Sequence, residues 1–190
     1  MLLRLLILFS LSAFSIGAHS TIRNASDCSN GAIQTAVNAA VDGDTVQIPT
    51  CSRTTWTGDI NIPNSKGLII QGNGTANTII GSGCHTMYFD TTTGRQPIRV
   101  TGIYFYNDCA ADNNTPPIRF VGTAQNWRVD HNTIDDQSTH GLCAIQQGTI
   151  GDENGDNYGW ESLITIYSKT ETTQPAYTLN GFVGELSILT

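Results

Sequence analysis

The sequence is poor in charged residues, and basic ones are especially few. Lysine and arginine together number 9 in 190 residues, against 16 aspartates and glutamates. A protein that binds nucleic acid normally carries a basic patch, so we expect no nucleic acid as a partner. A run of about 20 apolar residues, as a membrane-spanning helix needs, is also missing. These absences leave an acidic, β-type chain with many threonine, asparagine and glycine residues.

The N-terminus has the features of an export signal. Arg4 precedes an apolar stretch from Leu5 to Phe14, and Ala18-His19-Ser20 fits a small-x-small cleavage site. This pattern predicts a cleaved signal peptide over residues 1–20, with an uncleaved anchor as the alternative. We therefore expect a secreted or extracellular protein, with the periplasm or the cell surface as alternatives, and no membrane span after cleavage.

None of the five cysteines has the spacing of a metal site, so zinc is not expected. An oxidising compartment favours disulfides, and an odd number leaves at least one thiol. We predict that Cys28–Cys51 ties an N-terminal cap to the first coil and that Cys84–Cys109 joins neighbouring rungs. Cys143 would then be the free thiol.

A repeat is the most informative feature that is present. Ile70, Val100 and Val129 hold matching places in similar apolar phrases, 30 and 29 residues apart. Such a period indicates a solenoid whose units bury apolar faces against their neighbours. Because each unit consists of short strands and turns, we predict an all-β parallel β-helix over residues 21–190.

The elements can be placed from local patterns. Residues 31–40 have helical apolar spacing after the polar residues 27–30, so they predict one short helix inside an N-terminal cap at 21–44. Strand-like runs follow at 45–49, 60–62, 68–71, 78–80, 87–89, 98–106, 118–121, 127–134, 163–166, 177–179 and 186–190. The chain stops on apolar β-type sequence, which predicts the front part of a longer β-helix, or a last rung that pairs with another chain.

The repeat also predicts which side chains point outward. Apolar alternation changes at Gly102, which indicates a bend there, with His131 in the same place one rung later. Equivalent residues of successive rungs form ladders. We therefore expect Asp130 to stack above Thr101 and Asp135 above Tyr106, with Tyr104 and Thr133 also facing outward.

Three segments resemble the pectate-lyase-like superfamily of right-handed parallel β-helices: residues 32–48, 67–72, and the phrases at 100–105 and 127–132. The resemblance implies an exported carbohydrate-active protein. Trp127 to His131 is similar to the Trp-Ile-Asp-His motif of polysaccharide lyases. It implies that Asp130 binds calcium and that His131 supports it.

Two enzymatic chemistries fit these residues. β-Elimination on an acidic polysaccharide needs a base and a cation, and Asp130 with Asp135 and either Asp108 or Asp136 would offer oxygen ligands to calcium. Glycoside hydrolysis needs two carboxylates, which Asp130 and Asp135 would supply, or alternatively Asp135 and Asp136. His131 is a candidate acid or base, with a structural role at the bend as the alternative. Turn-binding aspartates are the alternative to both chemistries.

Aromatic residues suggest sugar recognition, since flat rings stack on sugar faces. Tyr104, Tyr106 and Trp127 are the candidates, and a buried packing role is the alternative for Trp127. The chain has no arginine after Arg128, whereas the lyases it resembles take their base from a later rung. That favours a non-catalytic adhesin, structural protein or glycan-binding scaffold. We predict engagement of a polysaccharide or cell-surface glycan, with cleavage left open.

Overall fold

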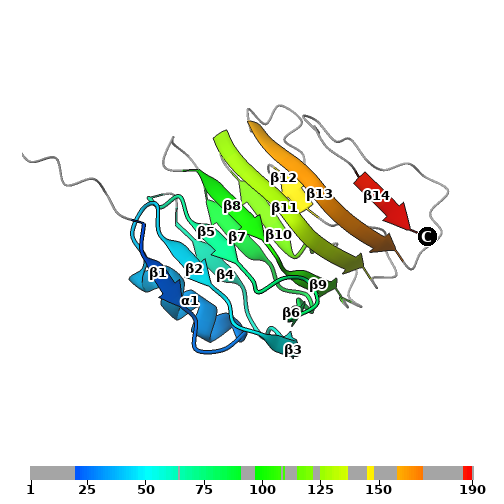
Figure 1. Ribbon diagram of the computed structural model, residues 1–190, viewed down its shortest axis with the longest axis horizontal. Helices are drawn as coiled ribbons and strands as arrows, with labels where there is room; N and C mark the ends of the chain where they lie inside the picture. Colours follow the sequence, from blue (N-terminus) through cyan, green and yellow to red (C-terminus); the bar gives the residue numbers. More distant parts are fainter. Residues whose placement is uncertain are drawn as a thin grey trace, which may run out of the picture.

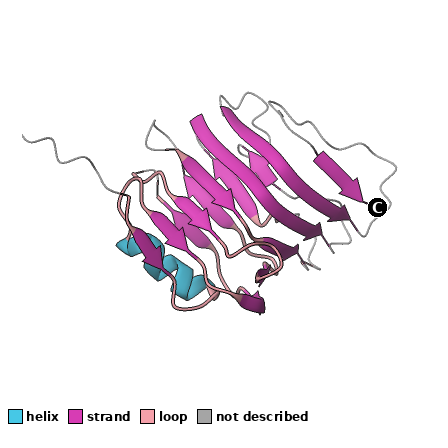
Figure 2. Ribbon diagram, in the orientation of Figure 1, coloured by secondary structure: helices cyan, strands magenta, loops and turns pink. Residues whose placement is uncertain are grey.

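The computed structural model describes residues 20–63, 65–90, 97–107, 109, 115–121, 125–136, 145–147, 158–168 and 186–189. Within these ranges the strands stack side by side in a β-solenoid of about four turns, with one short helix at one end (Figures 1 and 2). All the strand pairings within them are parallel. The predicted parallel β-helix is confirmed. Most of the predicted signal peptide, residues 1–19, lies outside the described residues, as does the strand predicted at 177–179.

Two sheets form the walls of the solenoid. The larger sheet runs in the order β1 (Ile22–Asn24), β2 (Thr45–Gln47), β5 (Ile69–Gln71), β8 (Ile98–Thr101), β11 (Gln125–Asp136), β9 (Tyr104–Asn107), β6 (Thr78–Gly81), β3 (Cys51–Thr55), and β13 (Tyr158–Ser168) pairs with β11 and with β14 (Leu186–Leu189). The smaller sheet runs β12 (Ile145–Gln147), β10 (Ile118–Val121), β7 (Met87–Asp90), β4 (Ile60–Ile62). Because β11 is long, it pairs with β8 through its first half and with β9 through its second half.

The helix α1 (Asn30–Ala39) closes the N-terminal end, one residue earlier than predicted. The Ser29 hydroxyl caps it by accepting a hydrogen bond from the backbone N–H of Ala32 at 3.2 Å. The Gln34 side chain reaches the edge strand β4, where it accepts from the Asn61 N–H at 2.7 Å and donates to the Asn61 carbonyl at 3.0 Å. The helix thus satisfies backbone groups that an open strand edge would leave exposed.

The register confirms the repeat. Ile70 pairs with Val100, and Val100 pairs with Val129. The two predicted stacks are also confirmed, because Asp130 pairs with Thr101 and Asp135 with Tyr106. Thr101 and Asp130 are buried, however, whereas Tyr106 and Asp135 are partly exposed. Strands β1, β3 and β12 were not predicted, since none of these short segments shows clear apolar alternation.

The interior is filled by ladders of apolar side chains. Val46, Ile70, Val100 and Val129 are fully buried in successive rungs of one wall. Each such side chain contributes about 1.5–3 kcal/mol of burial free energy. A stack of aromatic rings fills the space between the two walls. The ring centroids of Phe89 and Phe120, both from the smaller sheet, lie 4.8 Å apart, and those of Phe120 and Trp127, which comes from the larger sheet, lie 4.4 Å apart.

The position of Trp127 corrects one expectation. Its side chain is 2% exposed and lies in the core stack. The packing interpretation therefore holds, and the ring does not present a face on which a sugar could stack.

Both predicted disulfides are present. Cys28 is bonded to Cys51, and Cys84 is bonded to Cys109. The first ties the segment before α1 to β3, and the second links the turn after β6 to Cys109, two residues beyond the end of β9. Cys143 lies outside the described residues.

Candidate functional site

The predicted surface lies on the larger sheet where β8, β9 and β11 meet (Figure 1). A bend divides it, and the backbone at that bend is left-handed in two successive rungs. The φ angle is +73° at Gly102 and +53° at His131. The Gly102 N–H donates to the His131 carbonyl at 3.1 Å, so the two bends stack directly. The prediction that His131 takes the place of Gly102 at the bend is confirmed.

A buried asparagine holds this bend together. The Asn132 amide donates to the carbonyls of Val100 and Asp130, each at 2.9 Å, and its oxygen accepts from the Ile103 N–H at 3.0 Å. These bonds satisfy backbone groups that the bend removes from the strand ladder. Sequence reasoning missed Asn132, although a polar residue beside the bend in an otherwise apolar repeat was the available signal.

Asp130 lies at the centre of a charged cluster. The Arg99 guanidinium donates from Nε to Oδ1 and from Nη2 to Oδ2, both at 2.8 Å. Nη2 of Arg128 lies 2.7 Å from Oδ2, and Nδ1 of His131 lies 3.2 Å from the same oxygen. We call these four residues, Arg99, Arg128, Asp130 and His131, the Asp130 cluster.

The members of the Asp130 cluster differ sharply in exposure. The Asp130 side chain is fully buried, whereas the side chains of Arg99, Arg128 and His131 are 38%, 50% and 54% exposed. The partly exposed side chains of Arg99, Arg128 and His131 cover the Asp130 carboxylate. What the surface presents to solvent is guanidinium and imidazole rather than carboxylate.

The electrostatics of the cluster keep Asp130 ionised. Burial is the strongest single influence and by itself raises the pKa of Asp130. The hydrogen bond and charge of Arg99, the charge of Arg128 and a hydrogen bond from Thr101 together outweigh it, so the pKa lies below the usual aspartate value. In turn, the hydrogen bond to Asp130 raises the pKa of the Arg99 guanidinium. Asp130 is thus a stable anion and a poor proton donor.

The calcium ligands proposed from the sequence are not brought together among the described side chains. Calcium takes six to eight oxygen ligands, whereas both Asp130 oxygens already face cationic groups. Among the described residues, no group of three or more histidine, cysteine, aspartate or glutamate side chains is placed to hold a metal. Asp108 lies outside the described residues, and Asp136 is described only as the end of β11. The calcium site stays a prediction.

Beyond the bend the surface changes character. The Tyr104 hydroxyl donates to Oδ2 of Asp135 at 2.7 Å, and both side chains are partly exposed. Tyr106 is also partly exposed, but the Arg53 guanidinium lies 3.6 Å from the centre of its ring. A sugar that stacked on that face of Tyr106 would have to displace Arg53. The catalytic roles proposed for Asp130, Asp135 and His131 stay predictions.

Sequence reasoning also missed the two arginines of the cluster. Arg99 and Arg128 pair with each other in the β8–β11 register. Their signal was visible, because both precede the matching valine of the repeat. An arginine at the same outward position in two successive rungs, next to an outward aspartate, indicates an ion-pair cluster.

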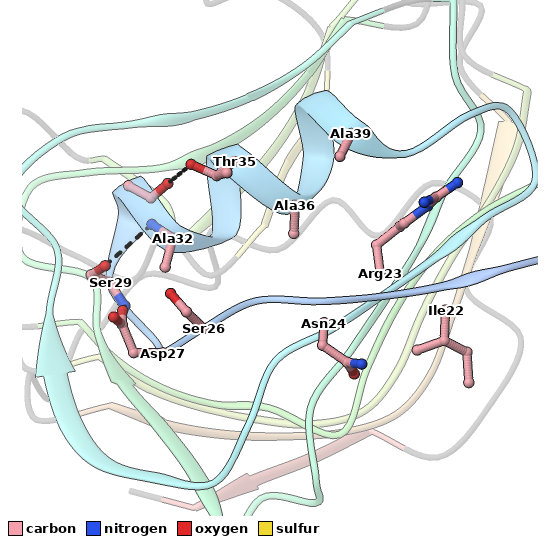
Figure 3. A pocket seen from close by; sticks show the side chains of 11 residues that line it. Ile22, Arg23, Asn24, Ser26, Asp27, Ser29, Ala32, Thr35, Ala36 and Ala39 are labelled. Carbon is pink, nitrogen blue, oxygen red and sulfur yellow. Dashed lines mark hydrogen bonds between the residues drawn. The ribbon is translucent and has the colours of Figure 1, made fainter.

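A separate groove of about 720 Å³ lies at the N-terminal end, between α1 and β1 (Figure 3). Small side chains of the helix, among them Ala32 and Ala36, face it from one side, and Ile22 and Asn24 line it from the strand. Its carboxylate, Asp27, accepts a hydrogen bond from the Ser29 N–H at 2.8 Å. The groove contains none of the residues that the sequence singled out as a site.

No helix within the described part of the chain has the length and apolar character needed to cross a bilayer. Neither a protein-family model nor any of the curated proteins or solved structures compared with the chain matches it. The resemblance to the pectate-lyase-like superfamily therefore stays a prediction.

Proposed function

We propose that this chain is an exported β-helix that engages an acidic polysaccharide on the outer face of β8, β9 and β11. The Asp130 cluster carries the proposal. Two partly exposed guanidinium groups, from Arg99 and Arg128, lie against one buried carboxylate, so positive charge exceeds negative charge at this point of an acidic protein. Arginine binds carboxylate and sulfate groups with paired, charge-assisted hydrogen bonds.

The neighbouring residues supply the other requirements of a sugar-binding surface. Tyr104 and Asp135 form a hydrogen-bonded pair beyond the bend, where ring edge and carboxylate suit hydroxyl groups. The parallel strands place the outer faces of successive rungs side by side, so an extended polymer can contact several rungs at once. Export is supported by the two disulfides, which persist in oxidising compartments.

Binding is favoured over cleavage by the state of Asp130. Arginines surround its oxygens and lower its pKa, so it serves poorly as a proton donor or as an open calcium ligand. Its role in our proposal is to hold Arg99 and Arg128 in position. A structural or adhesin-type β-helix without a polysaccharide ligand is the alternative.

The test uses the exported full chain and a panel of immobilised polymers: polygalacturonate, dextran sulfate and neutral dextran, at low ionic strength. We expect binding to one or both acidic polymers and none to neutral dextran. Preference between the two separates carboxylate from sulfate recognition. Arg128→Gln should weaken binding about 10-fold, about 1.4 kcal/mol. Arg119→Gln, which removes the same charge from the smaller sheet, is the matched control and should bind as the unmodified chain does.

The same samples answer the question of catalysis. Polygalacturonate incubated with calcium or with chelator is followed by the ultraviolet absorbance of unsaturated uronate products. Calcium-dependent product would establish a lyase and return Asp130 to the list of metal ligands. Absence of binding to all the polymers would contradict the proposal and leave the structural alternative.

A further inference from the structure

We propose that His131 determines which sugar the surface accepts, because its outer ring nitrogen takes a hydrogen bond from a sugar hydroxyl beside the acid group. This inference rests on the proposed function and adds a second recognised group to it. It starts from the backbone. His131 has a φ of +53°, a left-handed conformation that L-residues other than glycine rarely adopt.

The preceding rung shows what the fold itself requires at this position. Gly102, whose backbone N–H donates to the His131 carbonyl, has a φ of +73° and no side chain. Glycine adopts this conformation freely, whereas histidine adopts it at a cost in conformational energy. The bend would therefore form more easily with glycine at 131. A strained residue that the fold does not need is a reason to look for a role in binding.

The bend also places the His131 side chain where a ligand can reach it. In a regular strand, successive side chains point to opposite faces. Across the left-handed bend, Asp130 and His131 lie on the same outer surface instead, with Nδ1 of the histidine 3.2 Å from Oδ2 of the aspartate. The His131 side chain is 54% exposed. Along β11 it follows Arg128, which lies before the bend, and precedes Asp135, which lies after it.

The carboxylate determines what the ring offers. An anionic oxygen close to Nδ1 favours the tautomer with its proton on that nitrogen, which leaves Nε2 with an acceptor lone pair. Within the described residues, Nε2 has no hydrogen-bond donor of its own. The guanidinium groups of Arg99 and Arg128 bind an acid group, so the neighbouring acceptor fits a hydroxyl of the same sugar or of the next one.

The experiment compares two polymers of equal charge at pH 7.5: polygalacturonate and polygalacturonate whose hydroxyl groups are O-acetylated. We expect the full chain to prefer the free hydroxyls by about 5- to 10-fold, the effect of one hydrogen bond in a binding site. His131→Gly should remove this preference by weakening binding to the free polymer while leaving binding to the acetylated polymer unchanged. Its midpoint for unfolding in urea should be equal or higher, because glycine relieves the strain.

The outcomes separate the inference from the proposed function. If Arg128→Gln weakens binding but His131→Gly keeps the preference for free hydroxyls, the inference is overturned and the proposed function stands. A lower urea midpoint for His131→Gly would assign the ring a structural role and would also overturn it. If the unmodified chain binds neither form of polygalacturonate and no dextran sulfate, the proposed function fails, and the inference fails with it. Binding to dextran sulfate alone would overturn the inference and leave the proposed function standing.

Discussion

The outer face of the larger sheet differs between the rungs near the cap and the rungs in the middle. The strand register aligns one column of residues across four strands. The column runs from Gln47 of β2 through Gln71 of β5 and Thr101 of β8 to Asp130 of β11. Near the cap this column is made of amides. In the middle it contains a buried carboxylate, Asp130, which is covered by two arginines.

Near the cap, the side chains of this column make neutral hydrogen bonds. The buried carboxylate of that region, Asp44, lies outside the column and accepts hydrogen bonds from Arg23 and from two backbone N–H groups. The Gln47 amide donates to the carbonyl of Gln71 and to the Asn73 side chain, each at 3.0 Å. The Asn73 amide in turn donates to the Thr50 hydroxyl at 3.2 Å. These contacts satisfy backbone groups without burying a charge.

In the middle rungs, the same position of the backbone carries a buried carboxylate with ion pairs instead of an amide. Burying a carboxylate costs free energy that its ion pairs offset only when the geometry is good. Because amides occupy the same column near the cap, the repeat by itself does not demand a charge at the position of Asp130. The difference supports a role for the cluster in binding, and each variant below tests one part of that contrast.

We expect the largest loss of stability when the buried amide of the middle rungs, Asn132, is removed. Asn132→Ala removes the side-chain partner of the buried Ile103 N–H and of the Val100 and Asp130 carbonyls. We expect the free energy of unfolding to fall by about 3 kcal/mol, since each buried unsatisfied group costs about 1–3 kcal/mol. Urea unfolding followed by circular dichroism measures the change.

The matched variant near the cap is Asn73→Ala. Its amide is exposed, so water replaces the lost partners and the expected loss is at most about 1 kcal/mol. If the two variants lost equal free energy of unfolding, the bend in the middle rungs would depend on the Asn132 amide no more than the rung near the cap depends on the Asn73 amide. That result would contradict the contrast between the two regions.

Asp130→Asn should have the next largest effect. The substitution keeps the size of the side chain but leaves Arg99 and Arg128 facing each other without a countercharge. Removing one partner of a buried ion pair costs about 3–5 kcal/mol, and the two arginines can regain water, so we expect about 2 kcal/mol. Gln47→Ala, in the same column near the cap, should cost about 1 kcal/mol. If Asp130→Asn lowered the free energy of unfolding less than Gln47→Ala does, the ion pairs of the Asp130 cluster would contribute less to stability than the neutral hydrogen bonds near the cap.

The pH dependence of stability gives a further test of the cluster. The pKa of Asp130 is lower in the folded protein than the value near 4 of an unfolded chain. Its ion pairs therefore stabilise the fold fully above about pH 4, and this contribution is lost as the pH falls through the folded-state pKa. The pKa of Asp44 is also lowered, but Asp44 is present in both proteins, so its contribution cancels in the difference between their stabilities. The stability gap between the unmodified chain and Asp130→Asn should be constant from pH 5 to 7 and should narrow below about pH 4; a gap that widened in acid would contradict the assignment.

The sequence was sufficient for the fold because the fold repeats. Equivalence of Val100 and Val129 predicted the stacking, and from it the outward position of Asp130. The surroundings of Asp130 did not follow from that reasoning. The alternation of side chains along a strand assigns each side chain to one face of the sheet. It does not show that the long side chains of Arg99 and Arg128 fold back over the shorter side chain of Asp130. The resemblance to lyases then suggested calcium for a carboxylate that guanidinium groups already bind.

The smallest expected effect is at the bend that the two middle rungs share. Gly102→Ala adds a methyl group to a residue with a φ of +73°, and the added carbon would lie 3.1 Å from the Gly72 carbonyl oxygen. A left-handed L-residue costs about 1–2 kcal/mol, and we expect a loss near 1 kcal/mol in urea unfolding. Gly31→Ala in α1, where the added carbon meets nothing within 4 Å, should instead stabilise by about 0.5–1 kcal/mol. If alanine were tolerated at 102 without loss, the left-handed bend would not be strained for L-residues. The conformation of His131 would then give no reason to look for a ligand at that ring.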